Sequence, residues 1–171
     1  MEIRKTTTAD EEALAALFGE ARATIAQLGI DQWQNGYPSL AVIRNDSALA
    51  RSYAVTDGEQ LIGTFVLIED GEPTYDTIYG GDWKTGNDNN SYLAIHRVAV
   101  SVRMRGKGIS TAILNYAERR ARALGRVSLR IDTHEGNVVM RRMLEKHGFL
   151  LCGVIYLENG DPRVAYEKVL G

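Results

Sequence analysis

The fold is decided by the stretch Arg103-Met-Arg-Gly106-Lys-Gly108-Ile-Ser110. An apolar run over residues 92–100 precedes it, and a stretch with helical periodicity over residues 111–124 follows it. The two glycines let the backbone approach an anion closely. The unpaired amides and the dipole of a helix start favour negative charge at the same place, to which three basic side chains add full charges. The pattern predicts a strand, a phosphate-binding turn and a helix; the alternative is a surface turn with solvated basic residues.

Two widespread phosphate-binding patterns are absent from this stretch. The dinucleotide pattern G-x-G-x-x-G fails because Thr111 stands where its third glycine would be. The P-loop spacing G-x-x-x-x-G-K-[ST] is also missing. The pattern that fits is R-x-x-G-x-G, which Arg103, Gly106 and Gly108 fill.

With this motif the chain resembles the GNAT N-acetyltransferase superfamily, whose central motif [QR]-x-x-G-x-[GA] lies at such a strand-to-helix junction. Further elements match the family in the expected order: His96-Arg-Val-Ala-Val100 before the motif, a strand from Val127 to Asp132 after it, then Asn137 through Lys146-His-Gly148-Phe149. The resemblance covers essentially the whole chain. It implies an α/β (α+β) fold with a mixed, mostly antiparallel central sheet splayed in the middle and flanking helices, as a single N-acetyltransferase domain over residues 1–171.

Apolar periodicity and turn residues predict the remaining elements. A capping box of Thr8 and Glu11 is expected to start a first helix that ends at Gly29. Ser39 is expected to cap a second helix. A hairpin is expected over residues 52–56 and 60–68, and further elements over residues 3–4, 109–124, 127–133, 137–147, 149–157 and 162–169. Residues 69–91 read as a long irregular segment, which is usually functional or mobile.

Composition narrows the class of protein. With 171 residues, 44% apolar and 25% charged, the chain is expected to form one globular domain. It has neither a signal-peptide pattern nor an apolar run of the ~20 residues needed to cross a membrane. Cys152 is the only cysteine, which excludes an internal disulfide and fits a reducing compartment. We therefore expect a cytoplasmic protein with no membrane partner.

Charge is distributed unevenly along the chain. Residues 1–90 hold 6 Lys/Arg against 15 Asp/Glu, whereas residues 91–171 hold 14 against 7. A basic half suits a ligand with several phosphates, and an acidic half suits a cationic acceptor. Undirected drift of surface charge is the alternative explanation for the acidic half. Because no extended basic stripe lacks nearby acids, nucleic acid is not an expected partner.

The resemblance implies that acetyl-CoA is the acyl donor and that the reaction is acyl transfer to a primary amine of a small molecule or peptide. In the family, the turn amides bind the CoA pyrophosphate, and the preceding strand pairs with the pantetheine as a further strand would. An amide near the thioester can stabilise the oxyanion. No metal is expected. The implied cofactor-binding residues are Val98, Val100, Arg103, Met104, Arg105, Gly106, Lys107, Gly108, Ile109, Ser110 and Asn137. Asn137 fits equally well as a helix N-cap.

An acceptor amine must lose a proton, so a base is needed. Asp132 stands at the position where some ribosomal-protein acetyltransferases of the superfamily place a catalytic glutamate. His96 lies on the strand implied to contact the donor, and His134 is two residues beyond Asp132. We predict Asp132 and His96 as the catalytic residues, with a structural role as the alternative for each.

Trp33 and Tyr37 are predicted to bind the acceptor, because they follow the first helix where the family builds its acceptor site and could hold a cation by cation–π contact. Further aromatics in residues 69–91, Tyr75, Tyr79 and Trp83, are candidates for the opposite wall. Anchoring of loops to the core is the alternative for all of them.

One residue departs from the family pattern. The helix over residues 137–147 carries Leu144 where the family often has the tyrosine that protonates the leaving thiolate. Tyr156 or water is the expected substitute. The departure also leaves open a non-catalytic acyl-CoA-binding or regulatory module. The sequence names neither the acceptor nor the oligomeric state, and a homodimer stays open.

Overall fold

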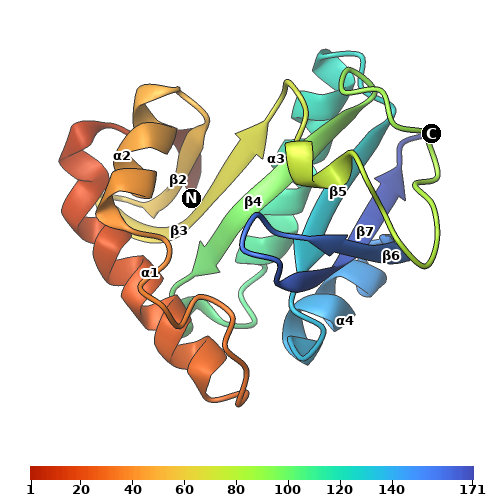
Figure 1. Ribbon diagram of the computed structural model, residues 1–171. Helices are drawn as coiled ribbons and strands as arrows, with labels where there is room; N and C mark the ends of the chain where they lie inside the picture. The colour runs from red at the N-terminus through yellow and green to blue at the C-terminus, as the bar shows by residue number, and fades with distance from the viewer. The chain divides into compact units, whose positions relative to one another are not determined.

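The computed structural model describes all 171 residues as a mixed α/β protein, which confirms the expected fold class. Its helices are α1 (Glu11–Ala26), α2 (Leu40–Ala48), α3 (Ile109–Ala123) and α4 (Val138–Lys146). Its strands are β1 (Glu2–Lys5), β2 (Ser52–Asp57), β3 (Gln60–Ile68), β4 (Tyr92–Val100), β5 (Ser128–Thr133), β6 (Leu150–Tyr156) and β7 (Pro162–Val169). The strand order is β1-β2-β3-β4-β5-β7-β6, and β4 and β5 pair in parallel (Figure 1).

The chain divides into two compact units. The first contains residues 1–67 and 97–113, and the second contains residues 68–96 and 114–171. Strand β4 and helix α3 each run through both units. No helix combines the length and apolar character that crossing a bilayer requires.

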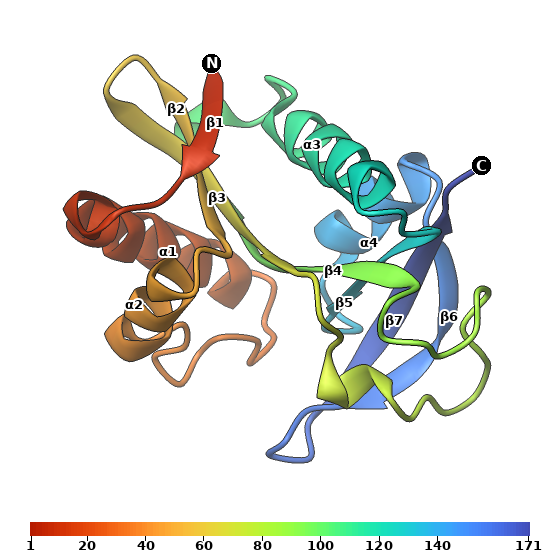
Figure 2. The same ribbon diagram turned by 90° about the horizontal axis from the view of Figure 1, so that it is seen from above.

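The first unit packs α1 and α2 against one face of β1, β2 and β3 (Figures 1 and 2). The three strands are antiparallel, with Ile3 opposite Val55 and Tyr53 opposite Phe65. Apolar residues of α1 recur at helical spacing and turn one stripe of the helix toward the strands. The core of this unit is formed by Leu14, Leu17, Phe18, Ile43 and Ala99.

The starts of the two helices test the predicted caps. Ser39 caps α2, because its Oγ accepts the backbone N–H of Val42 at 3.3 Å. The predicted Thr8–Glu11 capping box is wrong by one residue. The carboxylate that turns back is Asp10, which accepts the N–H of Thr7 at 2.8 Å. Asp10 also pairs with Arg4, and the hydrogen bond from this guanidinium is the main reason why the pKa of Asp10 falls to about 2.

The start of α3 rests on a glycine of β3. A Cβ atom built on Gly63 would lie 3.2 Å from Cγ2 of Ile109 and 3.4 Å from the carbonyl oxygen of Ala99. The first distance is tighter than an ordinary contact, and the second is at the lower limit of one. The missing side chain at residue 63 therefore lets the first residue of α3 pack directly onto the strand.

The second unit is built on β4, β5, β7 and β6. Tyr92 to Ala94 pair in parallel with Ser128 to Arg130, and β5–β7 and β7–β6 are antiparallel. Helix α4 and the part of α3 in this unit cover one face of these strands, and residues 69–91 cover the other (Figure 2). Because side chains alternate along a strand, Tyr92 and His96 share the face under residues 69–91 with Arg130 and Asp132.

A buried ion pair anchors the long segment over residues 69–91. Arg130 donates to Glu167 at 3.0 Å, and neither side chain is exposed to solvent. The guanidinium lies between the rings of Trp83 and Tyr92, 4.2 and 4.1 Å from their centres. Glu167 also accepts from Thr85. The predicted irregular segment is thus held by a polar core, although apart from one 3-10 turn (Pro73–Tyr75) it has no helix or strand of its own.

Candidate functional site

The glycine-rich turn of residues 101–108 lies between β4 and α3, as predicted. It contains one 3-10 turn, Val102–Met104, followed by Gly106 and Gly108, whose φ angles are +73° and +78°. This left-handed conformation favours glycine. Neither glycine has an atom of another part of the protein where a Cβ would stand. Backbone conformation, rather than lack of space, is the reason that glycine occupies both positions, and the turn is open to solvent.

Several backbone amides of this turn have no acceptor in the protein. The first hydrogen bond of α3 runs from the N–H of Ala112 to the carbonyl of Gly108 at 3.0 Å. The N–H groups of Gly106, Gly108, Ile109 and Ser110 therefore precede the helical ladder and donate to no protein group. They gather at the positive end of the helix dipole, which is the arrangement that binds phosphate oxygens.

The basic side chains of the turn are not neutralised by carboxylates. Arg103 is exposed and makes no ion pair, Arg105 donates to Oγ1 of Thr24 at 3.1 Å, and Nζ of Lys107 approaches the sulfur of Met104 at 4.0 Å. Three positive charges thus stand around the free amides. An anion of more than one charge is the ligand that this electrostatic environment favours.

The second half of β4 presents backbone groups on the side away from β3. The N–H of Ser101 donates to the carbonyl of Ile62 on β3 at 2.9 Å. Because backbone groups alternate between the two edges of a strand, those of Val98 and Val100 point to the opposite edge. An extended ligand could pair with them there, which is the role expected of these two residues.

A left-handed residue interrupts β4 at the boundary between the two units. Arg97 has a φ angle of +50°, which is strained for a residue with a side chain. Its guanidinium donates to both carboxylate oxygens of the buried Asp46, at 2.7 and 2.8 Å, and to the hydroxyl of Tyr37 at 2.6 Å. These bonds hold the strained residue and connect it to the loop before α2.

The two aromatic residues predicted to bind the acceptor lie close to each other. The rings of Trp33 and Tyr37 have their centres 6.2 Å apart, and Trp33 also packs edge-on against Phe18 of the core at 5.8 Å. Trp33 thus anchors the loop, as the alternative interpretation held. Tyr37 is held by Arg97. No finding tests whether either residue binds an acceptor, so that role stays a prediction.

His96 and Asp132, the two predicted catalytic residues, come together in the second unit. Nδ1 of His96 lies 3.9 Å from Oδ2 of Asp132, although the residues are 36 positions apart in the sequence. The histidine is 16% exposed and the aspartate 12%, so both are largely shielded yet still reach solvent. Such a pair can move a proton between a bound molecule and water.

A third acidic residue completes this cluster and was not predicted. Oε2 of Glu72 lies 2.9 Å from Nε2 of His96, and its other oxygen accepts from Oγ1 and the N–H of Thr74. Burial alone would raise the pKa of Glu72, but the hydrogen bond and charge of His96 together with the Thr74 bonds lower it to about 2. Glu72 is therefore a carboxylate at neutral pH.

Tyr75 fixes the other side of the cluster. Its hydroxyl donates to Oδ2 of Asp132 at 2.7 Å, and its ring centre lies 5.8 Å from that of His96. Burial, and then the charge of Asp132, raise the pKa of Tyr75 well above its ordinary value, so the phenol keeps its proton. Tyr75 and Trp83 are both buried, which makes them anchors of residues 69–91 rather than an exposed wall.

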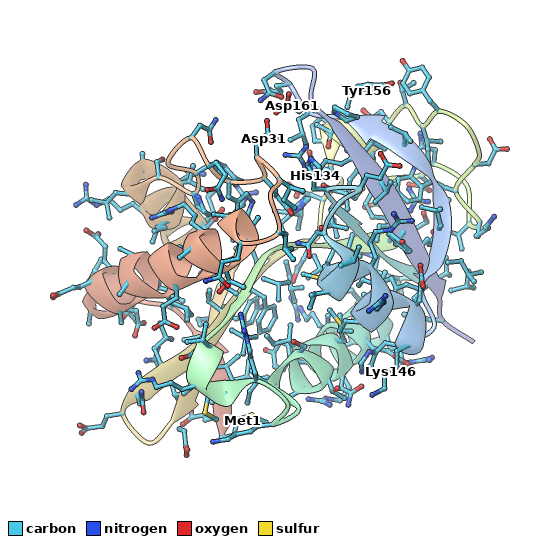
Figure 3. The ribbon with its side chains drawn as sticks, turned by 90° about the horizontal axis from the view of Figure 1, so that it is seen from below. Met1, Asp31, His134, Lys146, Tyr156 and Asp161 are labelled. Carbon is cyan, nitrogen blue, oxygen red and sulfur yellow. The ribbon has the colours of Figure 1, made fainter.

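The remaining predicted residues of the second unit have structural contacts. Asn137 caps α4, with its Oδ1 accepting the N–H of Met140 at 3.2 Å, which matches the N-cap alternative and leaves its predicted contact with CoA untested. Nδ1 of His134 accepts the N–H of Gly136 at 2.9 Å. Leu144 is fully buried in α4, so the position often held by tyrosine in the family points into the core here. Tyr156 is half exposed at the end of β6, beside the hairpin that carries Asp161 (Figure 3).

Sequence reasoning missed Glu72 and Asp46 for the same reason. Glu72 belongs to the irregular segment before β4 and Asp46 to an ordinary amphipathic helix, and neither stands in a motif. The only available signal for Glu72 was that long irregular segments are often functional. For Asp46 there was none. The structure has no group of three or more His, Cys, Asp or Glu side chains arranged to hold a metal ion.

Known structures match the chain over nearly its full length. A GNAT-family acetyltransferase from Streptococcus agalactiae is 34% identical, with a TM-score of 0.87 over 99% of this chain and 95% of that one. A GNAT-family acetyltransferase from Listeria monocytogenes (20% identity, TM-score 0.72, 99% and 94% covered) shares the fold. So does a ribosomal-protein-alanine N-acetyltransferase from Brucella melitensis (18%, 0.68, 99% and 100%). No curated protein matches the sequence.

The family model for the acetyltransferase (GNAT) family matches residues 16–149. This range holds the turn between β4 and α3 as well as Glu72, His96 and Asp132. The model covers more than half of the chain, and the S. agalactiae protein exceeds 30% identity over nearly all of it. The chain therefore belongs to the GNAT acetyltransferase family.

Proposed function

We propose that the protein is an acetyl-CoA-dependent N-acetyltransferase that transfers the acetyl group to a primary amine by direct attack on the thioester. The observation that carries this is the turn between β4 and α3, where four free amides and three unpaired cations meet in a member of the GNAT family. A diphosphate would satisfy these amides and charges, and CoA carries one. The acceptor is an amine of a small molecule or peptide.

The donor would be held by the first unit's turn and strand. The amides of residues 106 and 108–110 would bind the diphosphate, with Arg103, Arg105 and Lys107 neutralising its charge. The backbone of Val98 and Val100 would pair with the extended pantetheine arm. Bound in this way, acetyl-CoA supplies the activated acyl group. Because a thiolate is a good leaving group, the reaction does not require the general acid that the family often has at the position of Leu144.

The acceptor must reach the donor as a free amine. His96 and Asp132 are the groups proposed to remove its proton, since they are shielded, adjacent and in contact with solvent. Tyr37 and Trp33 are proposed to contact the acceptor. Acceptors that carry positive charge, such as polyamines or basic amino acids, are expected to fit best, in line with the acidic first half of the chain.

Calorimetric titration with acetyl-CoA tests the donor site. We expect micromolar binding to the wild type and at least about tenfold weaker binding to an Arg103→Ala/Arg105→Ala variant. Arg119→Ala/Arg142→Ala removes the same charge outside the turn and should bind as the wild type does. ADP should compete weakly, because it lacks the pantetheine arm. Equal binding of ADP and acetyl-CoA would instead indicate a general nucleotide site.

The buried Leu144 supports one alternative, a non-catalytic acyl-CoA-binding module. The two functions differ in turnover. Release of CoA with members of a broad amine panel, abolished by His96→Ala or Asp132→Asn, would eliminate the module. Tight binding of acetyl-CoA without CoA release for any amine would eliminate the enzyme.

A further inference from the structure

Glu72 contacts the predicted catalytic histidine although it lies outside every recognised motif. Glu72 is held both by its backbone and by its carboxylate. The backbone N–H of Glu72 donates to the hydroxyl of Tyr92 at 2.8 Å, Oε1 accepts two hydrogen bonds from Thr74, and Oε2 faces Nε2 of His96. A carboxylate that faces one ring nitrogen determines whether the other nitrogen carries a hydrogen or a lone pair.

The protonation state of the ring follows from this contact. An ionised carboxylate can only accept hydrogen bonds, so Nε2 of His96 must carry a hydrogen to bond with Glu72 at 2.9 Å. When the imidazole is neutral, its lone pair is therefore on Nδ1. That atom lies on the side of Asp132, at a distance of 3.9 Å from Oδ2, which is too long for a direct hydrogen bond.

The space between Nδ1 and Oδ2 suits one hydrogen-bond donor. A nitrogen or a water oxygen about 2.8 Å from each atom would contact both. Oδ2 of Asp132 is held in place by the hydroxyl of Tyr75, which keeps its own proton. The titratable groups that face His96 are thus Glu72 at Nε2, Asp132 on the side of Nδ1, and Tyr75 against the ring. Nδ1 and Oδ2 of Asp132 are the two acceptors that one bridging donor would contact.

We propose that Glu72 is a positioning residue that holds His96 as the Nε2–H tautomer, so that Nδ1 is the atom that takes the proton from the acceptor ammonium beside Asp132. This rests on the proposed function and names the working atom within it. Nδ1 receives one ammonium proton, and the lone pair freed on nitrogen attacks the thioester carbon. The C–N bond forms, the C–S bond breaks with its electron pair on sulfur, and the second nitrogen proton passes to the thiolate. The imidazolium then returns its proton to water.

The tautomer can be measured without any acceptor. Long-range ¹H–¹⁵N spectra of histidine-labelled protein at about pH 8, where an ordinary imidazole is neutral, report which nitrogen carries hydrogen. The chain has three histidines, and His96→Gln identifies the signal of residue 96. We expect Nε2–H in the wild type and a mixture of tautomers in Glu72→Ala. Glu69→Gln removes a charge three residues away, from a surface ion pair with Arg120, and should keep the wild-type spectrum.

Turnover supplies the second readout. In Glu72→Ala we expect kcat to fall at least about tenfold with the KM for acetyl-CoA unchanged. In Glu72→Gln the acidic limb of the pH–rate profile should move to lower pH, because a neutral amide no longer stabilises the imidazolium. An Nδ1–H tautomer in the wild type would overturn the proposal, and so would a Glu72→Ala variant with unchanged spectrum or unchanged pH profile. If no amine is acetylated, the proton-acceptor role falls with the proposed function, while the spectra alone decide whether Glu72 sets the tautomer.

Discussion

The hydroxyl of Tyr75 donates a 2.7 Å hydrogen bond to Oδ2 of Asp132, joining a 3-10 turn of the segment between β3 and β4 to β5. The two residues are 57 positions apart in the sequence. The phenol is fully buried and keeps its proton, so it acts as a fixed donor. The orientation of one predicted catalytic group therefore depends on a residue in an irregular segment.

Tyr75→Phe should distinguish the effect of Tyr75 on the orientation of Asp132 from its effect on the stability of the fold. Loss of the hydrogen bond should lower the free energy of unfolding by about 0.5–1.5 kcal/mol. Turnover should fall about tenfold, because Asp132 loses the contact that orients it. Urea denaturation and CoA release measure the two effects. Tyr53→Phe makes the same change in the first unit and should keep wild-type turnover. An equal loss of turnover in both variants would contradict a specific role of Tyr75 in orienting Asp132.

The pair formed by Arg97 and Asp46 predicts a large effect on stability. Asp46→Ala leaves a largely buried guanidinium without its carboxylate and should cost about 3–5 kcal/mol of unfolding free energy. The double variant Asp46→Leu/Arg97→Met should recover part of this loss, since it removes the buried charge of Arg97, while Arg51, 3.5 Å from Asp46, still loses its carboxylate. Chemical denaturation checks both variants. A double variant that is no more stable than Asp46→Ala would show that the strained backbone at Arg97, and not its charge, needs the contact.

Two glycines should respond in opposite directions to the same substitution. Gly63→Ala places a methyl group against Ile109 and should destabilise the protein by about 1–3 kcal/mol. It should also weaken acetyl-CoA binding, because the displaced Ile109 is the first residue of α3, next to the proposed phosphate-binding amides. Gly19→Ala adds its methyl group in open space within α1 and should stabilise by about 0.5–1 kcal/mol. Thermal melts and calorimetry measure these changes, and a stabilising Gly63→Ala would contradict the packing described.

Acid should destabilise the protein over a defined range. The pKa values of Asp10 and Glu72 are each lowered to about 2 in the folded state. A carboxylate whose folded pKa lies below its unfolded value stabilises the fold above the unfolded value, and this contribution is lost as the pH falls through the folded pKa. The unfolding free energy should therefore drop between the ordinary carboxylate value of about 4 and about pH 2.

Asp10→Asn tests this sign directly. The variant should be less stable than the wild type at neutral pH, because Arg4 and the N–H of Thr7 lose an ionised partner. The difference should shrink toward pH 2, where the wild-type carboxyl is also protonated. Glu12→Gln on the exposed face of α1 serves as the control. A difference that stays constant across the range would assign the effect to shape, not to charge.

Local sequence patterns were sufficient for most elements. The bounds of β4 were predicted to the residue, and the caps of α2 and α4 were predicted at Ser39 and Asn137, because alternation, periodicity and caps are local signals. The first capping box was misplaced by one residue, since Thr7 and Thr8 both offer a hydroxyl and Asp10 and Glu11 both offer a carboxylate. Only the bonds that form in the folded chain distinguish them.

The sequence by itself determined the family, the order of the elements and the glycine-rich turn between β4 and α3, because glycines, basic residues and a helix start act within a dozen neighbouring positions. The tertiary structure alone decided which side chains surround His96. Glu72 and Tyr75 come from the segment between β3 and β4, and Asp132 comes from β5. Only the pairing of β4 with β5 and the packing of residues 69–91 over that face bring them to one ring. The physical reason is that hydrogen bonds between distant segments depend on distances that chain folding sets, and no local pattern records them.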